Sequence, residues 1–228
     1  MIMGFCMRIF FNGCSITWGA ELEEKEEQRY STLIGHQQNA EVVNIAKSGV
    51  SNDWIVEKTI SWFSDHNYKY GADLAIIQFT EPSRWIWYDP NDKERRICIQ
   101  KSDPKKFSQN PEEYRASRTY YKSIYSDLMG IQNRWKNQYI LETFFKFRNI
   151  PYIFCDMKSH HYDQKIQDCN WKTLCAQQQT LNLMWDNSIL ESYSANSDRY
   201  APNGHPSAKG HQRIAEYLND MIEEWQEF

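Results

Sequence analysis

Residues 13–19, with the sequence GCSITWG, directly follow an apolar run at residues 7–11, MRIFF. A short apolar run that ends at glycine predicts a buried strand. A serine between two glycines at the end of a strand can hold its hydroxyl at the open edge of a sheet, as a nucleophile requires. The stretch therefore predicts an α/β protein whose first strand presents Ser15 as a candidate nucleophile.

Three more apolar runs predict the rest of the sheet, at residues 41–46, 72–80 and 151–157. Helical patterns separate these runs, and an amphipathic pattern that starts just after Pro206 predicts a C-terminal helix. Strands that alternate with helices imply right-handed crossovers and a sheet covered on both faces. We expect one domain over residues 1–228, with a three-layer α/β/α architecture and a short parallel sheet.

Residues 81–149 form a longer segment than a crossover between two strands needs, so we expect an insertion there. Its first half contains the aromatic residues Trp85, Trp87 and Tyr88 and is predicted to be a loop. Its second half has apolar residues at helical spacing, with Gly130 as the place where that helix would bend.

The composition argues against several classes of protein. Of 228 residues, 41% are hydrophobic and 15% are aromatic, as is typical of a folded globular chain. The net charge of -4 offers no broad attraction to nucleic acid, and acidic residues interrupt the basic residues at 93–106. No run approaches the roughly 18 apolar residues of a membrane span. Six cysteines without a CxxC pair fit a reducing compartment. We expect a cytoplasmic protein that binds neither nucleic acid nor membranes.

Polar residues follow three of the predicted strands. Ser15 follows the first strand, residues 47–52 (KSGVSN) follow the second, and residues 80–84 (TEPSR) follow the third. Residues 202–206 (PNGHP) come immediately before the last helix. Ligands of open parallel sheets bind at the carboxyl ends of the strands, so we expect the functional site there.

The motifs GCSITWG, NIAKSG at residues 44–49 and GHPSAKGH at residues 204–211 together resemble the SGNH, or GDSL-like, serine hydrolases, over nearly the whole chain and in the right order. The stretches GCSITWG, NIAKSGVSND at residues 44–53 and FTEPSR at residues 79–84 look like a phage or environmental branch of that superfamily. The resemblance implies a flavodoxin-like fold with Ser15 as nucleophile and His205 as general base. It also implies oxyanion donors at the backbone N–H groups of Ser15 and Gly49 and at the end of the third strand.

Three positions depart from the family pattern. Cys14 stands where the commonest motif has aspartate, which is not a catalytic group. Thr80 stands where the family has an asparagine that donates to the oxyanion, and Gln78 could replace it only by facing the site. Pro202 stands where the family has the aspartate of the triad. Asp198 is the nearest upstream carboxylate and our candidate acid, with Asn203 or a backbone carbonyl as neutral alternatives. The resemblance also implies that a second histidine, His211, is structural.

Three further residues are candidates for binding a substrate: Asn52, Arg84 and Trp85. Asn52 could instead cap a helix, Arg84 could pair with Glu81, and Trp85 could pack the insertion onto the sheet.

The family resemblance implies hydrolysis of a small acyl ester through an acyl-Ser15 intermediate, without a metal or cofactor. An acetylated carbohydrate is the first substrate class to test, and a small lipid or a thioester the next. The alternative is a catalytically weak or inactive module that binds a glycan or a small ligand, because the asparagine and the aspartate are missing from their usual positions. The oligomeric state stays open.

Overall fold

A computed structural model of the chain describes residues 7–65, 72–88, 96–99, 111–157, 170–175, 181–182, 198–202 and 204–226. At its centre lies a five-stranded parallel sheet with the strand order β2-β1-β3-β6-β7. The strands are β1 (Arg8–Asn12), β2 (Glu41–Asn44), β3 (Leu74–Phe79), β6 (Tyr152–Asp156) and β7 (Leu181–Asn182). The four predicted strands are thereby confirmed, whereas the two-residue strand β7 carries too short a signal to be predicted.

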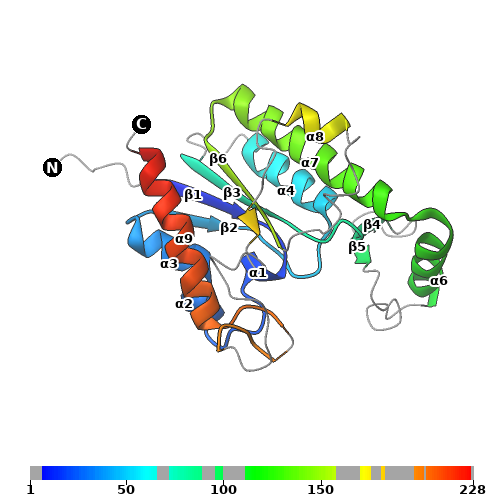
Figure 1. Ribbon diagram of the computed structural model, residues 1–228, viewed down its shortest axis with the longest axis horizontal. Helices are drawn as coiled ribbons and strands as arrows, with labels where there is room; N and C mark the ends of the chain where they lie inside the picture. Colours follow the sequence, from blue (N-terminus) through cyan, green and yellow to red (C-terminus); the bar gives the residue numbers. More distant parts are fainter. Residues whose placement is uncertain are drawn as a thin grey trace.

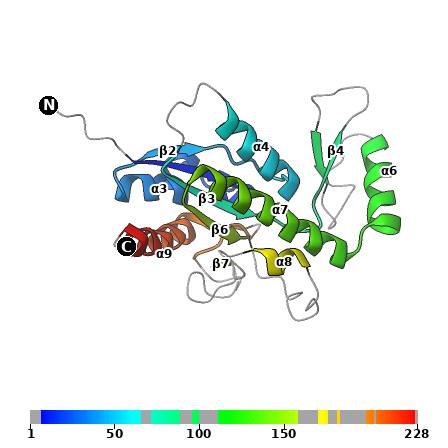
Figure 2. The ribbon, with the colours of Figure 1, turned by 90° about the horizontal axis from the view of Figure 1, so that it is seen from above.

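Helices cover both faces of the sheet, as Figures 1 and 2 show. On one face, α3 packs against α9, and on the other α4 packs against α7. The helices are α1 (Ser15–Trp18), α2 (Lys25–Gln28), α3 (Tyr30–Gln37), α4 (Asn52–Ser64), α6 (Pro111–Thr119), α7 (Asp127–Arg148), α8 (Asn170–Leu174) and α9 (Ala208–Gln226). A short π-helix, η1 (Tyr120–Ile124), follows α6. The predicted three-layer α/β/α fold is confirmed.

The sheet has the hydrophobic interior that its sequence predicts. All six residues of β3, LAIIQF, are buried, because helices lie on both faces of this central strand. Ile9 and Phe10 of β1 are likewise fully buried, and Phe10 packs against Phe63 of α4. Gln78 is the one polar residue within β3, and its side chain serves the candidate site described below.

The insertion differs from its prediction in its first half. Trp85–Tyr88 (β4) and Arg96–Ile99 (β5) form an antiparallel pair where we expected a loop, and the side chains of Trp87 and Tyr88 lie outside the described residues. Helix α7 runs through Gly130 without ending there. A Cβ at this glycine would lie 2.9 Å from the Pro82 carbonyl oxygen and 2.6 Å from the Tyr125 hydroxyl. Gly130 thus allows close packing of α7 against the segment after β3.

Within the described part of the chain, no helix combines the length and the apolar composition that crossing a membrane requires.

Candidate active site

Ser15 lies at the first position of α1, immediately after β1 and the tight turn at Gly13. The serine is 3% exposed. A Cβ at Gly13 would come within 2.4 Å of Thr17 Oγ1 and 2.9 Å of Gln78 Cβ, so only glycine fits this turn. The N–H groups of the first helical turn have no intrahelical acceptor, so the Ser15 N–H is a candidate donor to an oxyanion.

The side-chain amide of Gln78 binds the turn that carries the candidate nucleophile. Its Oε1 accepts a 2.8 Å hydrogen bond from Thr17 Oγ1, and its Nε2 donates to the Phe79 carbonyl at 3.0 Å and to Cys14 Sγ at 3.2 Å. Gln78 is completely buried. Its amide is therefore used to support the turn, and it does not take the place of the asparagine donor.

The ends of β1, β2 and β3 lie at the same edge of the sheet, since these three strands are neighbours and parallel. The segment after β2 contains Gly49, which has a positive φ of 81°, and is joined to the nucleophile turn by a 3.3 Å hydrogen bond from Lys47 N to the Gly13 carbonyl. Asn44 Nδ2 also donates to the Thr17 carbonyl at 2.9 Å. The structure thus brings the segments of Ser15 and Gly49 together.

Thr80 and Asn52 bind each other. The Thr80 N–H donates to Asn52 Oδ1 at 2.8 Å, and Asn52 Nδ2 donates to the Thr80 carbonyl at 3.1 Å. Both residues are buried. The helix cap that we considered for Asn52 is supplied by Ser51, whose hydroxyl accepts from the Trp54 N–H. Asn52 therefore fixes the end of β3 against the start of α4.

A positive charge acts on this edge of the sheet. Burial raises the pKa of the Cys14 thiol, but the Arg84 guanidinium and hydrogen bonds from Thr80, the Ile16 backbone and Gln78 outweigh burial, so that the pKa lies below its ordinary value. Cys14 directly precedes the candidate nucleophile. The same field favours negative charge on an oxyanion formed next to it.

His205 binds Glu21, a residue that we did not single out from the sequence. The ring nitrogen Nδ1 lies 2.6 Å from Glu21 Oε2, and the His205 N–H donates to the same oxygen at 3.3 Å. Glu21 has a positive φ of 68°, a conformation that non-glycine residues rarely adopt and that is enriched at functional sites. Glu21 lies six residues after Ser15, so the segment that follows β1 carries both the candidate nucleophile and the partner of the histidine.

Asp198, our candidate acid, is bonded to Lys209 of α9. Its carboxylate accepts a 2.6 Å hydrogen bond from Lys209 Nζ, and both side chains are exposed. The Asp198 carbonyl accepts from the Ser207 hydroxyl at 2.6 Å, which ties the segment before α9 to its first turn. The carboxylate beside His205 is that of Glu21 instead of Asp198, because the loop before α9 directs Asp198 to Lys209. Asn203, the neutral alternative, lies outside the described residues.

His211 is fully buried between α9 and α3. Its Nδ1 accepts a 3.2 Å hydrogen bond from the Tyr30 N–H, and the two rings are stacked with centroids 5.9 Å apart. Burial, with a smaller effect of nearby His205, lowers the pKa of His211 from 6.5 to about 3. The ring is therefore neutral at ordinary pH and holds α9 against the start of α3.

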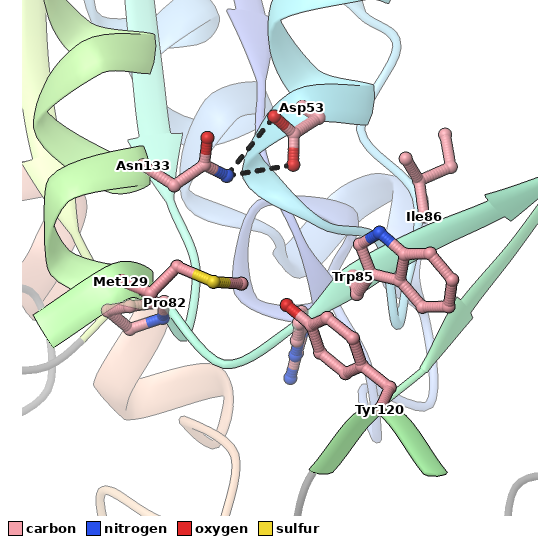
Figure 3. Close-up of a pocket in the computed structure, with 9 residues that line it drawn as sticks. Asp53, Pro82, Trp85, Ile86, Tyr120, Met129 and Asn133 are labelled. Carbon is pink, nitrogen blue, oxygen red and sulfur yellow. Dashed lines mark hydrogen bonds between the residues drawn. The ribbon is translucent and has the colours of Figure 1, made fainter. Parts of the chain in front are cut away.

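A pocket of about 510 Å³ opens at the end of β3, between α4, α7 and the β4 strand (Figure 3). Arg84 and Trp85, two of the candidate binding residues, line it. Arg84 Nη1 donates to the Val50 carbonyl at 3.3 Å, while its backbone N–H donates to the Glu81 carbonyl at 3.1 Å. The Trp85 ring stacks on Tyr120 with centroids 4.6 Å apart and an angle of 12°. The full set of lining residues is Asp53, Pro82, Arg84, Trp85, Ile86, Tyr120, Met129, Gly130 and Asn133.

Among the residues that the structure describes, no group of three or more His, Cys, Asp or Glu side chains could hold a metal ion.

Solved structures that align with this chain include a lipolytic protein and esterases. A protein from Desulfitobacterium hafniense assigned to the G-D-S-L lipolytic family aligns with a TM-score of 0.55 and 12% identity, over 94% of this chain and 98% of that one. A psychrotrophic esterase from Pseudoalteromonas sp., inhibited by monoethylphosphonate, aligns with a TM-score of 0.57 and 11% identity, over 97% and 99% of the two chains.

A family two carbohydrate esterase from Clostridium thermocellum, solved in complex with cellohexaose, aligns with a TM-score of 0.51 and 15% identity, over 96% of this chain and 64% of that one. No protein-family model and no curated protein matches the sequence. At these identities the likeness concerns the fold, and the chain has an SGNH/GDSL-like fold.

Proposed function

We propose that this protein is a serine esterase that hydrolyses small acyl esters, with Ser15 as nucleophile, His205 as general base and Glu21 as the carboxylate that orients the histidine. The 2.6 Å hydrogen bond between His205 Nδ1 and Glu21 carries the proposal. A carboxylate at Nδ1 fixes the tautomer that leaves Nε2 free to accept a proton, and it stabilises the imidazolium that results. The G-D-S-L assignment and esterase activity of the structural neighbours support the same chemistry.

In the first half of the reaction, Ser15 Oγ attacks the carbonyl carbon of the ester while its proton passes to His205 Nε2. The carbonyl oxygen becomes an oxyanion, which accepts hydrogen bonds from the N–H groups of Ser15 and Gly49. The tetrahedral intermediate then collapses, the bond to the alcohol oxygen breaks, and the imidazolium of His205 protonates the departing alcohol. Ser15 is left acylated.

In the second half, His205 takes a proton from water as the water oxygen attacks the acyl-Ser15 carbonyl. The new intermediate collapses to release the carboxylic acid and to return the proton to Ser15 Oγ. The backbone N–H groups of Ser15 and Gly49 carry the oxyanion, with the buried Thr80 hydroxyl as a third candidate donor and the charge of Arg84 nearby. An acetylated carbohydrate is the first substrate class to test, as several structural neighbours are carbohydrate esterases. Small lipids and thioesters come next.

The test compares wild type with Ser15→Ala in two assays, hydrolysis of 4-nitrophenyl acetate and labelling by a fluorophosphonate. We expect wild type to be active and labelled, and Ser15→Ala to lose both, because the reagent and the substrate form a bond to the same oxygen. The matched control is Ser61→Ala, which removes an exposed serine of α4. Labelling that persists in Ser15→Ala contradicts the nucleophile. An inactive, unlabelled wild type that still binds a glycan supports the alternative of a binding module.

A further inference from the structure

The pocket beside the candidate active site shares its walls with the segments that carry the proposed catalytic groups. Asp53 of the pocket adjoins Asn52, whose amide is bonded to Thr80 at the end of β3. Arg84 of the pocket donates to the carbonyl of Val50, the residue after Gly49. Through Asn52 and Val50, the pocket is thus joined to the segments that carry Thr80 and Gly49.

One wall of the pocket holds an oriented carboxylate. Asn133 Nδ2 donates to both oxygens of Asp53, at 3.2 and 3.0 Å, and Asn137 Nδ2 donates to Oδ1 at 3.2 Å (Figure 3). An ionised carboxylate has about four acceptor positions, so these three bonds orient the group and leave it able to accept another. Asp53 can therefore take a hydrogen bond from a ligand that donates one.

The other polar wall holds a donor that lacks a partner. Arg84 is only 9% exposed, and within the described part of the protein its Nε has no hydrogen-bond acceptor. A buried donor without an acceptor costs about 1–3 kcal/mol, and a ligand oxygen would remove that cost. Arg84 Nε is thus available to donate to a ligand that accepts a hydrogen bond.

Between these walls lies an aromatic surface made by Trp85 and Tyr120. Figure 3 shows the Tyr120 hydroxyl and the Met129 side chain pointing into the pocket from different sides. Burial, with a smaller effect of Asp53, raises the pKa of Tyr120, so its hydroxyl stays protonated and can donate as well as accept. Flat apolar faces next to polar groups suit a ring that carries hydroxyls on its edge.

The two charged residues of the pocket are of opposite sign, so together they give it no net preference for a cation or an anion. A neutral hydroxyl can both donate to Asp53 and accept from Arg84. The volume of about 510 Å³ falls within the range of roughly 300–1,000 Å³ usual for small-molecule sites.

We propose that this pocket binds a neutral, hydroxyl-rich sugar unit, the alcohol part of the ester whose acyl group is transferred to Ser15. The claim that this sugar is the alcohol part of the ester rests on the proposed esterase function, whereas sugar binding in the pocket does not. Asp53 accepts from one sugar hydroxyl, Arg84 Nε donates to another, and the Trp85 and Tyr120 pair supports the ring.

The experiment measures binding in the Ser15→Ala protein, which keeps the pocket and removes hydrolysis. Cellotetraose and xylotetraose are titrated by calorimetry and tryptophan fluorescence, with tetragalacturonate as the anionic comparison. We expect a neutral tetrasaccharide to bind, and Asp53→Asn and Trp85→Leu each to weaken its binding at least tenfold. Asp220→Asn, an exposed aspartate of α9, is the matched control and should bind as its parent does. Circular dichroism checks that each variant is folded, and Trp85→Phe replaces Trp85→Leu if the latter is not.

Three results overturn the proposal: no binding of either neutral tetrasaccharide, equal binding by the parent and the Asp53→Asn variant, or tighter binding of tetragalacturonate. The esterase proposal fails separately, because it depends on fluorophosphonate labelling of Ser15, which needs no sugar. If the protein binds sugar but is not labelled, the sugar-binding proposal stands and the esterase proposal is rejected. If it is labelled but binds no sugar, the esterase proposal stands and the sugar-binding proposal is rejected.

Discussion

At the scale of single residues, the pairing of His205 with Glu21 is the contact on which the proposed chemistry depends. The two residues are 184 positions apart in the chain, and their side chains meet at 2.6 Å. Because Glu21 lies close in sequence to the candidate nucleophile and far from His205, the residues around the histidine give no sign of it. Glu21 also comes just before the charged stretch EEKEE at residues 23–27, and such a stretch is typical of a solvated surface.

Glu21→Gln tests this pairing. Glutamine can still accept a hydrogen bond from His205 Nδ1, but it cannot stabilise the imidazolium by charge, so we expect kcat to fall by about 10²–10⁴-fold. Glu21→Asp should retain more activity, because it keeps the charge. Steady-state hydrolysis of 4-nitrophenyl acetate measures both variants.

Asp198→Asn is the matched comparison, since it removes the carboxylate that the sequence singled out. Its carboxylate binds exposed Lys209, and such surface pairs contribute little. We expect near wild-type kcat. A larger loss in Asp198→Asn than in Glu21→Gln would make Asp198 the acid and reject Glu21.

At the scale of elements, a buried ion pair joins α7 to the end of β6. Arg134 Nε and Nη2 donate to the two oxygens of Asp156, at 3.0 and 2.8 Å, and both side chains are almost fully buried. The guanidinium also lies over the rings of Phe79 and Trp135. The sequence places α7 by its apolar spacing, but it does not show that the charged Arg134 faces inward, because the partner is in another element.

Asp156→Asn removes the charge that both Arg134 Nε and Nη2 face, and we expect it to lower the free energy of unfolding by about 3–5 kcal/mol. The control is Glu216→Gln, which removes one partner of the exposed pair Arg213–Glu216 within α9 and should cost under about 1 kcal/mol. Urea unfolding followed by circular dichroism measures both variants. Equal losses would show that the Arg134 pair contributes no more than a surface pair.

At the scale of the whole molecule, the sheet could be predicted and the contacts between distant segments could not. The buried strands are readable because each is a short apolar run, and their parallel arrangement follows from the helices between them. The insertion was harder, since β4 and β5 are only four residues each, too short for their pattern to be told from a loop, although the turn signal DPND at residues 89–92 separates them. Ser15 and Gly49 could be placed at one edge of the sheet in advance because both directly follow neighbouring strands. Glu21 follows no strand, so only the folded chain brings it to His205.

The buried His211 makes the stability of the whole fold depend on pH. Its pKa is about 3 in the folded protein and near 6.5 in the unfolded chain. Above pH 6.5 the ring is neutral in both states and adds no pH dependence. Below that value the unfolded chain takes up a proton that the folded protein excludes, so stability falls by up to about 1.4 kcal/mol per pH unit until the pH nears 3.

His211→Asn removes the titrating ring and keeps an acceptor for the Tyr30 N–H. We expect the variant to be less stable than wild type at pH 7, where its smaller side chain packs less well against Tyr30. Between pH 6 and pH 4 that difference should shrink by about 1.4 kcal/mol per pH unit, because only wild type pays for excluding the proton. Urea unfolding at pH 7, 6, 5 and 4 measures it, with His36→Asn, an exposed histidine of α3, as control. A constant difference between wild type and His211→Asn across this range would show that His211 takes up its proton equally in both states.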